Sequence, residues 1–87
     1  MDVRVKILFT TTPTEKHKAD MFDVASALTN ERRSVTVFSL PDESQVIVAE
    51  FTIKKARQSD VVDIIGKAFS HGVDDYNDCT IAFPKRR

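Results

Sequence analysis

Residues 3–9 follow a period of two, with one fully apolar row and one row that carries the charged residues. The apolar row of this stretch consists of Val3, Val5, Ile7 and Phe9. The other row contains Arg4, Lys6 and Leu8. A period of two residues is typical of a half-buried β-strand. A shift of one residue would bury Arg4 and Lys6, so the pattern fixes which row faces the core. We predict that 3–9 is the central strand of a small sheet.

The next segment has apolar residues at helical spacing. Its predicted buried stripe consists of Met21, Val24, Ala25 and Leu28. We predict Thr12 as the N-cap, Pro13 as the first helical residue and Glu15 as the partner in a capping box. Thr14 is an alternative cap. The helix is expected to end at 29–30, because Asn tolerates the left-handed conformation that often ends a helix.

Two further strands follow, at 34–40 and 45–53, joined by a turn at 41–44. In the strand 34–40 both Val35/Val37 and Phe38/Leu40 are apolar, so its inward face is ambiguous. In the strand 45–53 Glu50 places its own row outward. The inward row is then Ile47, Ala49, Phe51 and Ile53.

A second helix is predicted from Ser59, which would be its cap, to the Gly72 stop. Its buried stripe is expected to be Val61, Ile64, Ile65, Ala68 and Phe69. Gly66 lies inside this helix, where glycine costs up to about 1 kcal/mol against Ala, and this suggests close approach of another backbone. A short last strand is predicted at 79–83, with Cys79 facing inward.

The order β-α-β-β-α-β predicts a single α+β domain over residues 1–87. Right-handed crossovers favour a four-stranded antiparallel sheet in the order 4-1-3-2, with both helices on one face. This arrangement resembles the ferredoxin-like plait. The resemblance lies in element order alone, and the fold hosts many unrelated functions.

The composition says more about the cellular location of the protein than about its function. The 87 residues carry a formal net charge of +0 and a single cysteine, so no internal disulfide can form. A lone cysteine favours a reducing, cytoplasmic setting. No apolar run approaches the roughly 20 residues of a membrane span, so we expect no membrane association.

The predicted topology gathers the basic clusters at one end of the molecule and the acidic loops at the other. The basic residues are Arg32, Arg33, Lys54, Lys55, Arg57, Lys85, Arg86 and Arg87. The acidic loops contain Asp42, Glu43, Asp74, Asp75 and Asp78. The basic end is a candidate site for an anion or for the RNA backbone. The outer rows of the predicted strands 3–9 and 45–53 lack the aromatic side chains on which bases would stack.

The predicted outer face of the sheet has no helix over it. Its candidate interface residues are Arg4, Lys6, Leu8, Phe38, Val48 and Glu50. Our leading interpretation is a small non-enzymatic module that binds a protein partner or a second copy of itself through this face and the polarised ends. Nucleic-acid binding through the basic end is the first alternative.

A second alternative is small-ligand or anion binding at the loop Thr10–Thr14, which starts the first helix. That loop lacks the glycines and the lysine of a phosphate-binding loop, so capping explains it better. The two histidines, His17 and His71, are expected to be solvated or to cap helices. The sequence therefore indicates no catalytic residue, no metal site and no cofactor.

Overall fold

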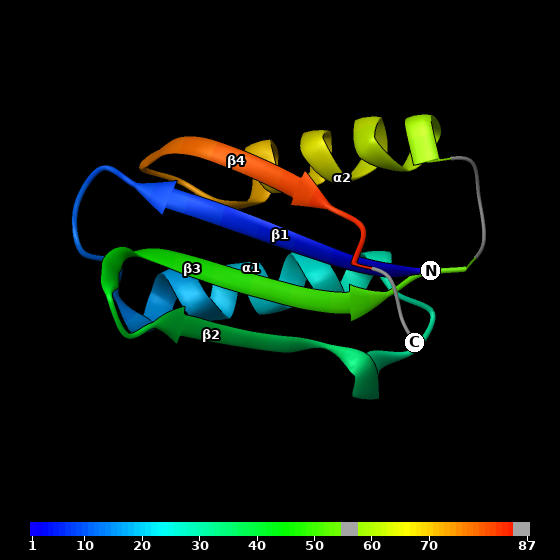
Figure 1. Cartoon of the computed structure of the whole chain (residues 1–87), viewed down its shortest axis with the longest axis horizontal. Helices are drawn as coiled ribbons and strands as arrows, with labels where there is room; N and C mark the ends of the chain where they lie inside the picture. Colours follow the sequence, from blue (N-terminus) through cyan, green and yellow to red (C-terminus); the bar gives the residue numbers. More distant parts are fainter. Residues whose placement is uncertain (55–57, 85–87) are drawn as a thin grey trace.

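The computed structural model describes residues 1–54 and 58–84. Its elements are β1 (Asp2–Phe9), α1 (Glu15–Leu28), the 3-10 turn η1 (Arg32–Ser34), β2 (Thr36–Leu40), β3 (Glu43–Thr52), α2 (Gln58–Gly72) and β4 (Tyr76–Ala82). The four strands form one antiparallel sheet in the order β2-β3-β1-β4. This is the predicted order 4-1-3-2 read from the opposite edge. Both helices lie on the same face of the sheet (Figure 1), and the predicted ferredoxin-like α+β fold is confirmed.

The core lies between the helices and the inner face of the sheet. All four apolar residues of the inner row of β1 are at most 1% exposed. They pack with Met21 and Ala25 of α1 and with the buried side of α2. The rings of Phe51 on β3 and Phe69 on α2 stack with their centroids 6.4 Å apart. The alternating pattern of β1 therefore identified the inner face correctly.

Strand pairing decides the face of β2 that the sequence left ambiguous. Val37 pairs with the fully buried Ala49, so it faces the helices. Phe38 pairs with Val48 and lies on the outer face. The residue before the strand, Val35, packs against the core cluster. The Val35/Val37 set is therefore the inward one.

Several predicted boundaries differ from the structure, and the strands predicted at 34–40 and 45–53 run over Thr36–Leu40 and Glu43–Thr52. The N-cap of α1 is Thr14, so the alternative cap is the right one and the predicted box of Thr12 and Glu15 is wrong. The second helix begins one residue before Ser59, which therefore lies inside α2. The last strand begins at Tyr76, three residues earlier than predicted, because Phe9 at the end of β1 supplies a pairing partner there.

The outward side of α2 is more apolar than expected. We predicted Ile64 in the buried stripe, but it is 57% exposed, and Val62 is 39% exposed. Val61, Ile65 and Phe69 are buried as predicted. The reason is that the sheet covers one side of the helix only, while apolar residues occur on more than that side.

Close packing at a glycine occurs at Gly72, not at the predicted Gly66. A Cβ atom at position 66 would lie 4.0 Å from Cδ1 of Ile81, which is ordinary contact. A Cβ atom at position 72 would lie 2.3 Å from Cγ2 of Val24. Glycine at the end of α2 therefore allows α2 to pack directly against α1.

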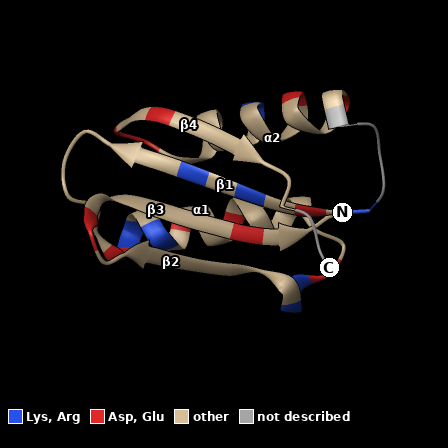
Figure 2. Ribbon diagram, viewed as in Figure 1, with Lys and Arg blue, Asp and Glu red and all other residues tan. Residues whose placement is uncertain are grey.

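The strands and helices run back and forth along the long axis of the molecule, so different loops lie at its two ends (Figure 1). One end contains the Thr10–Thr14 loop, the turn between β2 and β3, and the loop from α2 to β4. We call it the acidic end, because these loops carry Asp42, Asp74 and Asp75 (Figure 2). The opposite end contains η1, the end of β3 and the start of α2.

Candidate functional site

The predicted sheet-face residues all lie on the outer face of the sheet, which no helix covers (Figure 1). Nε of Arg4 donates a hydrogen bond of 2.6 Å to Oε2 of Glu50 on the neighbouring strand. Val48 is only 3% exposed, whereas Leu8 is 38% exposed. The surface that this face offers to a partner is therefore mixed, with little apolar area.

The described basic residues share one end of the molecule, as predicted. Arg32 and Arg33 lie in η1 and Lys54 follows β3. Carboxylates lie beside them in the chain, with Glu31 before η1 and Asp60 in the first turn of α2. The remaining predicted basic residues, Lys55, Arg57, Lys85, Arg86 and Arg87, lie outside the described residues. Nucleic-acid binding at this end stays a prediction.

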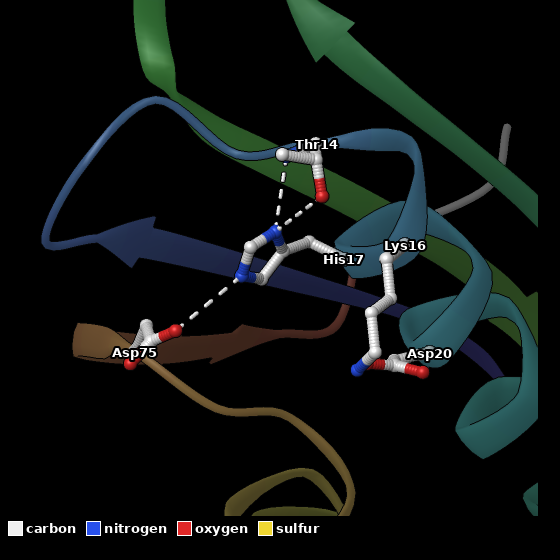
Figure 3. Close-up of polar contacts among 5 residues, drawn as sticks. All are labelled: Thr14, Lys16, His17, Asp20 and Asp75. Atoms are coloured by element: carbon white, nitrogen blue, oxygen red, sulfur yellow. Dashed lines mark hydrogen bonds and ion pairs between the residues drawn. The ribbon is translucent and has the colours of Figure 1, made fainter.

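The Thr10–Thr14 loop leads into a capped helix start. Nδ1 of His17 accepts a hydrogen bond of 3.0 Å from the backbone N–H of Thr14, and Oγ1 of Thr14 lies 3.1 Å from the same nitrogen (Figure 3). The other ring nitrogen, Nε2, lies 3.8 Å from Oδ2 of Asp75. The ring also packs edge-on against Phe9, with centroids 4.8 Å apart.

These contacts assign a structural role to His17. Nδ1 accepts the backbone N–H of Thr14 and is therefore occupied by the helix cap. His17 acts as the reciprocal half of the α1 cap.

Charges of both signs lie around this helix start, where the carboxylates of Glu15, Asp20, Asp74 and Asp75 outnumber the ammonium groups of Lys16 and Lys18. Nζ of Lys16 donates a hydrogen bond of 3.1 Å to Oδ2 of Asp20 (Figure 3). This hydrogen bond, with further attraction from Asp74 and Asp75, raises the pKa of the Lys16 ammonium. An anion at the Thr10–Thr14 loop would face the same carboxylates. The anion form of the second alternative is therefore disfavoured here, and a small ligand must be sought elsewhere in the fold.

An apolar cleft lies at the opposite end, where the end of α1, the end of β3 and the first turns of α2 meet. Its volume is about 190 Å³. The lining residues are Leu28, Ile53, Lys54, Val61, Ile64 and Ile65. Val61 and Ile65 are buried and form its floor, while the exposed Ile64 stands at its rim. Five of the six lining side chains are aliphatic.

Lys54 is the charged residue of this cleft. Among the described residues it has no ion-pair partner, so its ammonium is available to a bound group. The N-terminus of α2, with its positive end of the helix dipole, points to the same end. The cleft therefore offers apolar walls and one positive charge, a combination that suits a small molecule with an apolar body and an anionic group.

Sequence reasoning assigned the five aliphatic lining residues to the core and Lys54 to the basic end, and it missed the cleft. The signal was present in α2, where positions 61, 62, 64, 65, 68 and 69 are all apolar. A helix on one face of a sheet buries a single stripe, so this set was too wide to be covered completely. The excess apolar surface includes the residue that rims the cleft, Ile64.

Other candidate chemistries find little support in the described residues. Within 1–54 and 58–84, no three His, Cys, Asp or Glu side chains gather to form a metal site. Cys79 is half-buried, and burial, together with the Asp78 carboxylate, raises the pKa of its thiol. A thiol with a raised pKa is a poor nucleophile at neutral pH. No helix in the described part of the chain is long and apolar enough to cross a membrane.

The fold is also found in a solved structure. No family model matches the chain, and no curated protein matches it. The solved structure is described as that of a "putative Antibiotic biosynthesis monooxygenase from Chloroflexus aurantiacus J-10-fl". The two chains superpose with a TM-score of 0.57 over 99% of this chain and 93% of that one, at 14% sequence identity. At this identity the likeness shows a shared fold.

The comparison corrects the leading interpretation of the sequence. A non-enzymatic module acting through the sheet face is wrong as the leading interpretation, because the structure that shares this fold over almost the whole chain is described as an enzyme. The small-ligand alternative agrees better with that neighbour. At the Thr10–Thr14 loop the polar groups bind one another, whereas the apolar cleft is an open cavity of about 190 Å³.

Proposed function

We propose that this protein binds a small organic molecule with an apolar body and a single anionic group in the cleft between α1, β3 and α2. The observation that carries the proposal is a largely aliphatic cavity of about 190 Å³ with one charged residue, Lys54, in its lining. Pockets for drug-sized ligands have volumes of roughly 300–1,000 Å³, so the ligand expected here is smaller. Its apolar part would rest on Leu28 and Ile64, with its anionic group toward Lys54.

The shared fold favours this kind of ligand as well. The solved neighbour is described as a monooxygenase of antibiotic biosynthesis, a class of enzyme that acts on small molecules. A cytoplasmic location remains part of this proposal, and it rests on the lone cysteine of the sequence.

A binding titration with matched variants tests the cleft. The probe is 3-phenylpropionate, followed through backbone amide chemical shifts of the full chain, with 3-phenylpropanol as its uncharged counterpart. Ile64→Ser is expected to weaken binding about fivefold to tenfold, because a ligand loses roughly 1 kcal/mol of apolar contact. Val62→Ser is the matched control, since Val62 is also exposed on α2 but does not line the cleft.

The charge is tested separately. Lys54→Gln should remove the preference for the carboxylate over the alcohol, whereas Lys67→Gln, farther along α2, should leave it unchanged. Equal losses in the Ile64→Ser and Val62→Ser proteins, or a lack of saturable shifts around α2 in the original protein, would contradict the proposal.

A second candidate function is oxidation of the bound molecule with dioxygen, and the description of the fold neighbour is the observation that favours it. The measurement is oxygen uptake by the purified chain with a panel of small phenols. Uptake that depends on both protein and phenol and falls in the Ile64→Ser protein would support an enzyme. Uptake equal to that of buffer would leave ligand binding as the function to pursue.

A further inference from the structure

A hollow of mixed polarity lies on the uncovered face of the sheet, toward the acidic end. Its volume is about 260 Å³, and it spans the neighbouring strands β4, β1 and β3. The lining residues are Lys6, Leu8, Glu43, Val46, Asp78 and Thr80. We call this hollow the outer-face basin.

The floor of the basin is apolar because of the strand register. Leu8 on β1 pairs with Val46 on β3 and with Asp78 on β4, so these three residues form one row across the sheet. Val46 is only 3% exposed and Leu8 is 38% exposed. An apolar patch of the width of two strands thus ends at a carboxylate on the β4 side.

The lining of the basin carries more negative than positive charge, with Glu43 and Asp78 against Lys6. Nζ of Lys6 lies 3.5 Å from Oε2 of Glu43, so the one positive charge of the basin already has a partner. Oδ1 of Asp78 accepts a hydrogen bond of 3.0 Å from the backbone N–H of Cys79. Among the described residues Asp78 has no cationic partner. The basin therefore has one uncompensated negative charge, on the strand that faces Leu8.

Charge complementarity identifies the class of ligand. We propose that the outer-face basin binds a small organic primary amine, with its ammonium group at Asp78 and its apolar body on Leu8 and Val46. The hydroxyl group of Thr80 lies in the same lining and can accept a second hydrogen bond from the ammonium group. An anionic ligand finds no free cation here, because Lys6 is paired. The carboxylates elsewhere at the acidic end add to the attraction for a cation.

This site is separate from the apolar cleft. The two lie on opposite faces of the sheet and select ligands of opposite charge, so either one can fail without the other. Chemical shifts distinguish them, because the basin is lined by β1, β3 and β4, whereas the cleft is lined mainly by the two helices.

The test uses phenethylamine as the probe and 2-phenylethanol as a neutral molecule of the same shape, each titrated into the full chain. At low salt we expect the amine to bind about fivefold more tightly than the alcohol, the effect of one exposed charge pair. That advantage should shrink at high salt, since exposed charges are screened. The shifts should centre on residues 6–8, 46 and 78–80.

Two isosteric variants complete the experiment. Asp78→Asn keeps an acceptor for the Cys79 N–H and should reduce the affinity for the amine to that for the alcohol. Asp42→Asn, in the turn between β2 and β3 and outside the lining, should reduce the affinity for the amine far less and leave that for the alcohol unchanged. Equal binding of amine and alcohol, equal effects of the two variants, or a lack of saturable shifts on these strands would each overturn the proposal.

Discussion

The two ends of this molecule close the same core in different ways. At the acidic end polar groups bind one another across loops: the backbone N–H of Thr10 donates to the carbonyl of Asp75 at 2.8 Å, and Gln45 Nε2 donates to the carbonyl of Thr10 at 3.2 Å. His17 adds its contacts to Thr14 and Asp75 (Figure 3). At the other end polar groups also pair, since Oγ of Ser34 accepts a hydrogen bond of 3.1 Å from the N–H of Thr52, but beside them aliphatic side chains line an open cleft and Ile64 remains more than half exposed.

The difference separates stability from binding. Polar groups that already have partners within the protein stabilise loops but have little capacity left for a ligand. Apolar surface that the fold does not bury keeps its full driving force for association. The side chains of His17 and Thr14, whose residue types suggest a reactive or ligand-binding site in the sequence, therefore stabilise the helix start. The aliphatic side chains, which look like core, form the candidate site.

The largest stability effect is expected at Gly72, where α2 reaches the acidic end. Gly72→Ala should lower the free energy of unfolding by about 1–3 kcal/mol, because the new Cβ would lie 2.3 Å from Val24 Cγ2 and must displace it. Chemical denaturation measures the change. Gly66→Ala is the matched control and should raise stability by up to about 1 kcal/mol through helix propensity, since that position has room.

The double variant Val24→Ala, Gly72→Ala identifies the cause. If the clash with Val24 is the reason, the Gly72 substitution should cost much less in a Val24→Ala background. An equal cost in both backgrounds would show that the backbone conformation at Gly72, and not the contact between the helices, requires glycine.

A smaller effect is expected from the α1 cap. His17→Ala should lower the free energy of unfolding by about 1 kcal/mol, because the N–H of Thr14 loses its acceptor. His17→Gln should recover part of that loss, since glutamine at this helix position can accept the same hydrogen bond. His71→Ala, in the last turn of α2, is the control on an exposed histidine. Equal stabilities of the Ala and Gln variants at position 17 would refute the capping role.

The smallest effect is expected at Cys79, because the pKa of its thiol responds to the neighbouring Asp78 carboxylate. Burial and the Asp78 carboxylate raise the pKa of its thiol in the folded protein above the value in the unfolded chain. The stability that this shift contributes is therefore fully present below the unfolded pKa and is lost as pH rises through the folded pKa. At mildly alkaline pH we expect iodoacetamide to react with Cys79 more slowly than with the unfolded chain.

The Asp78→Asn variant sharpens that measurement. Removing the negative charge should lower the pKa of Cys79 toward its ordinary value and speed the reaction, while the Asp42→Asn protein should react like the original. Reaction rates equal to those of the unfolded chain at all pH values would show that the folded state does not protect this thiol.

Much of the fold could be predicted from the sequence. The period of two in β1 and Glu50 in β3 fixed the inner faces of two central strands, because a slip would have buried charges. The order of elements then fixed the topology, since right-handed crossovers leave few alternatives. Capping was harder, because Thr12 and Thr14 precede the helix with equally acceptable chemistry, and only the position of His17 selects between them.

The candidate site could not be predicted from the sequence, for a different reason. Local pattern determined which residues are apolar and where helices and strands run, and the order of these elements determined that both helices share one face of the sheet. Only the tertiary structure decided that Ile64 remains exposed beside a cleft, that His17 meets Asp75, and that Asp78 adjoins Leu8 and Val46. Those outcomes depend on distances between elements that are far apart in the chain, and hydrophobic periodicity carries information about the orientation of one element at a time.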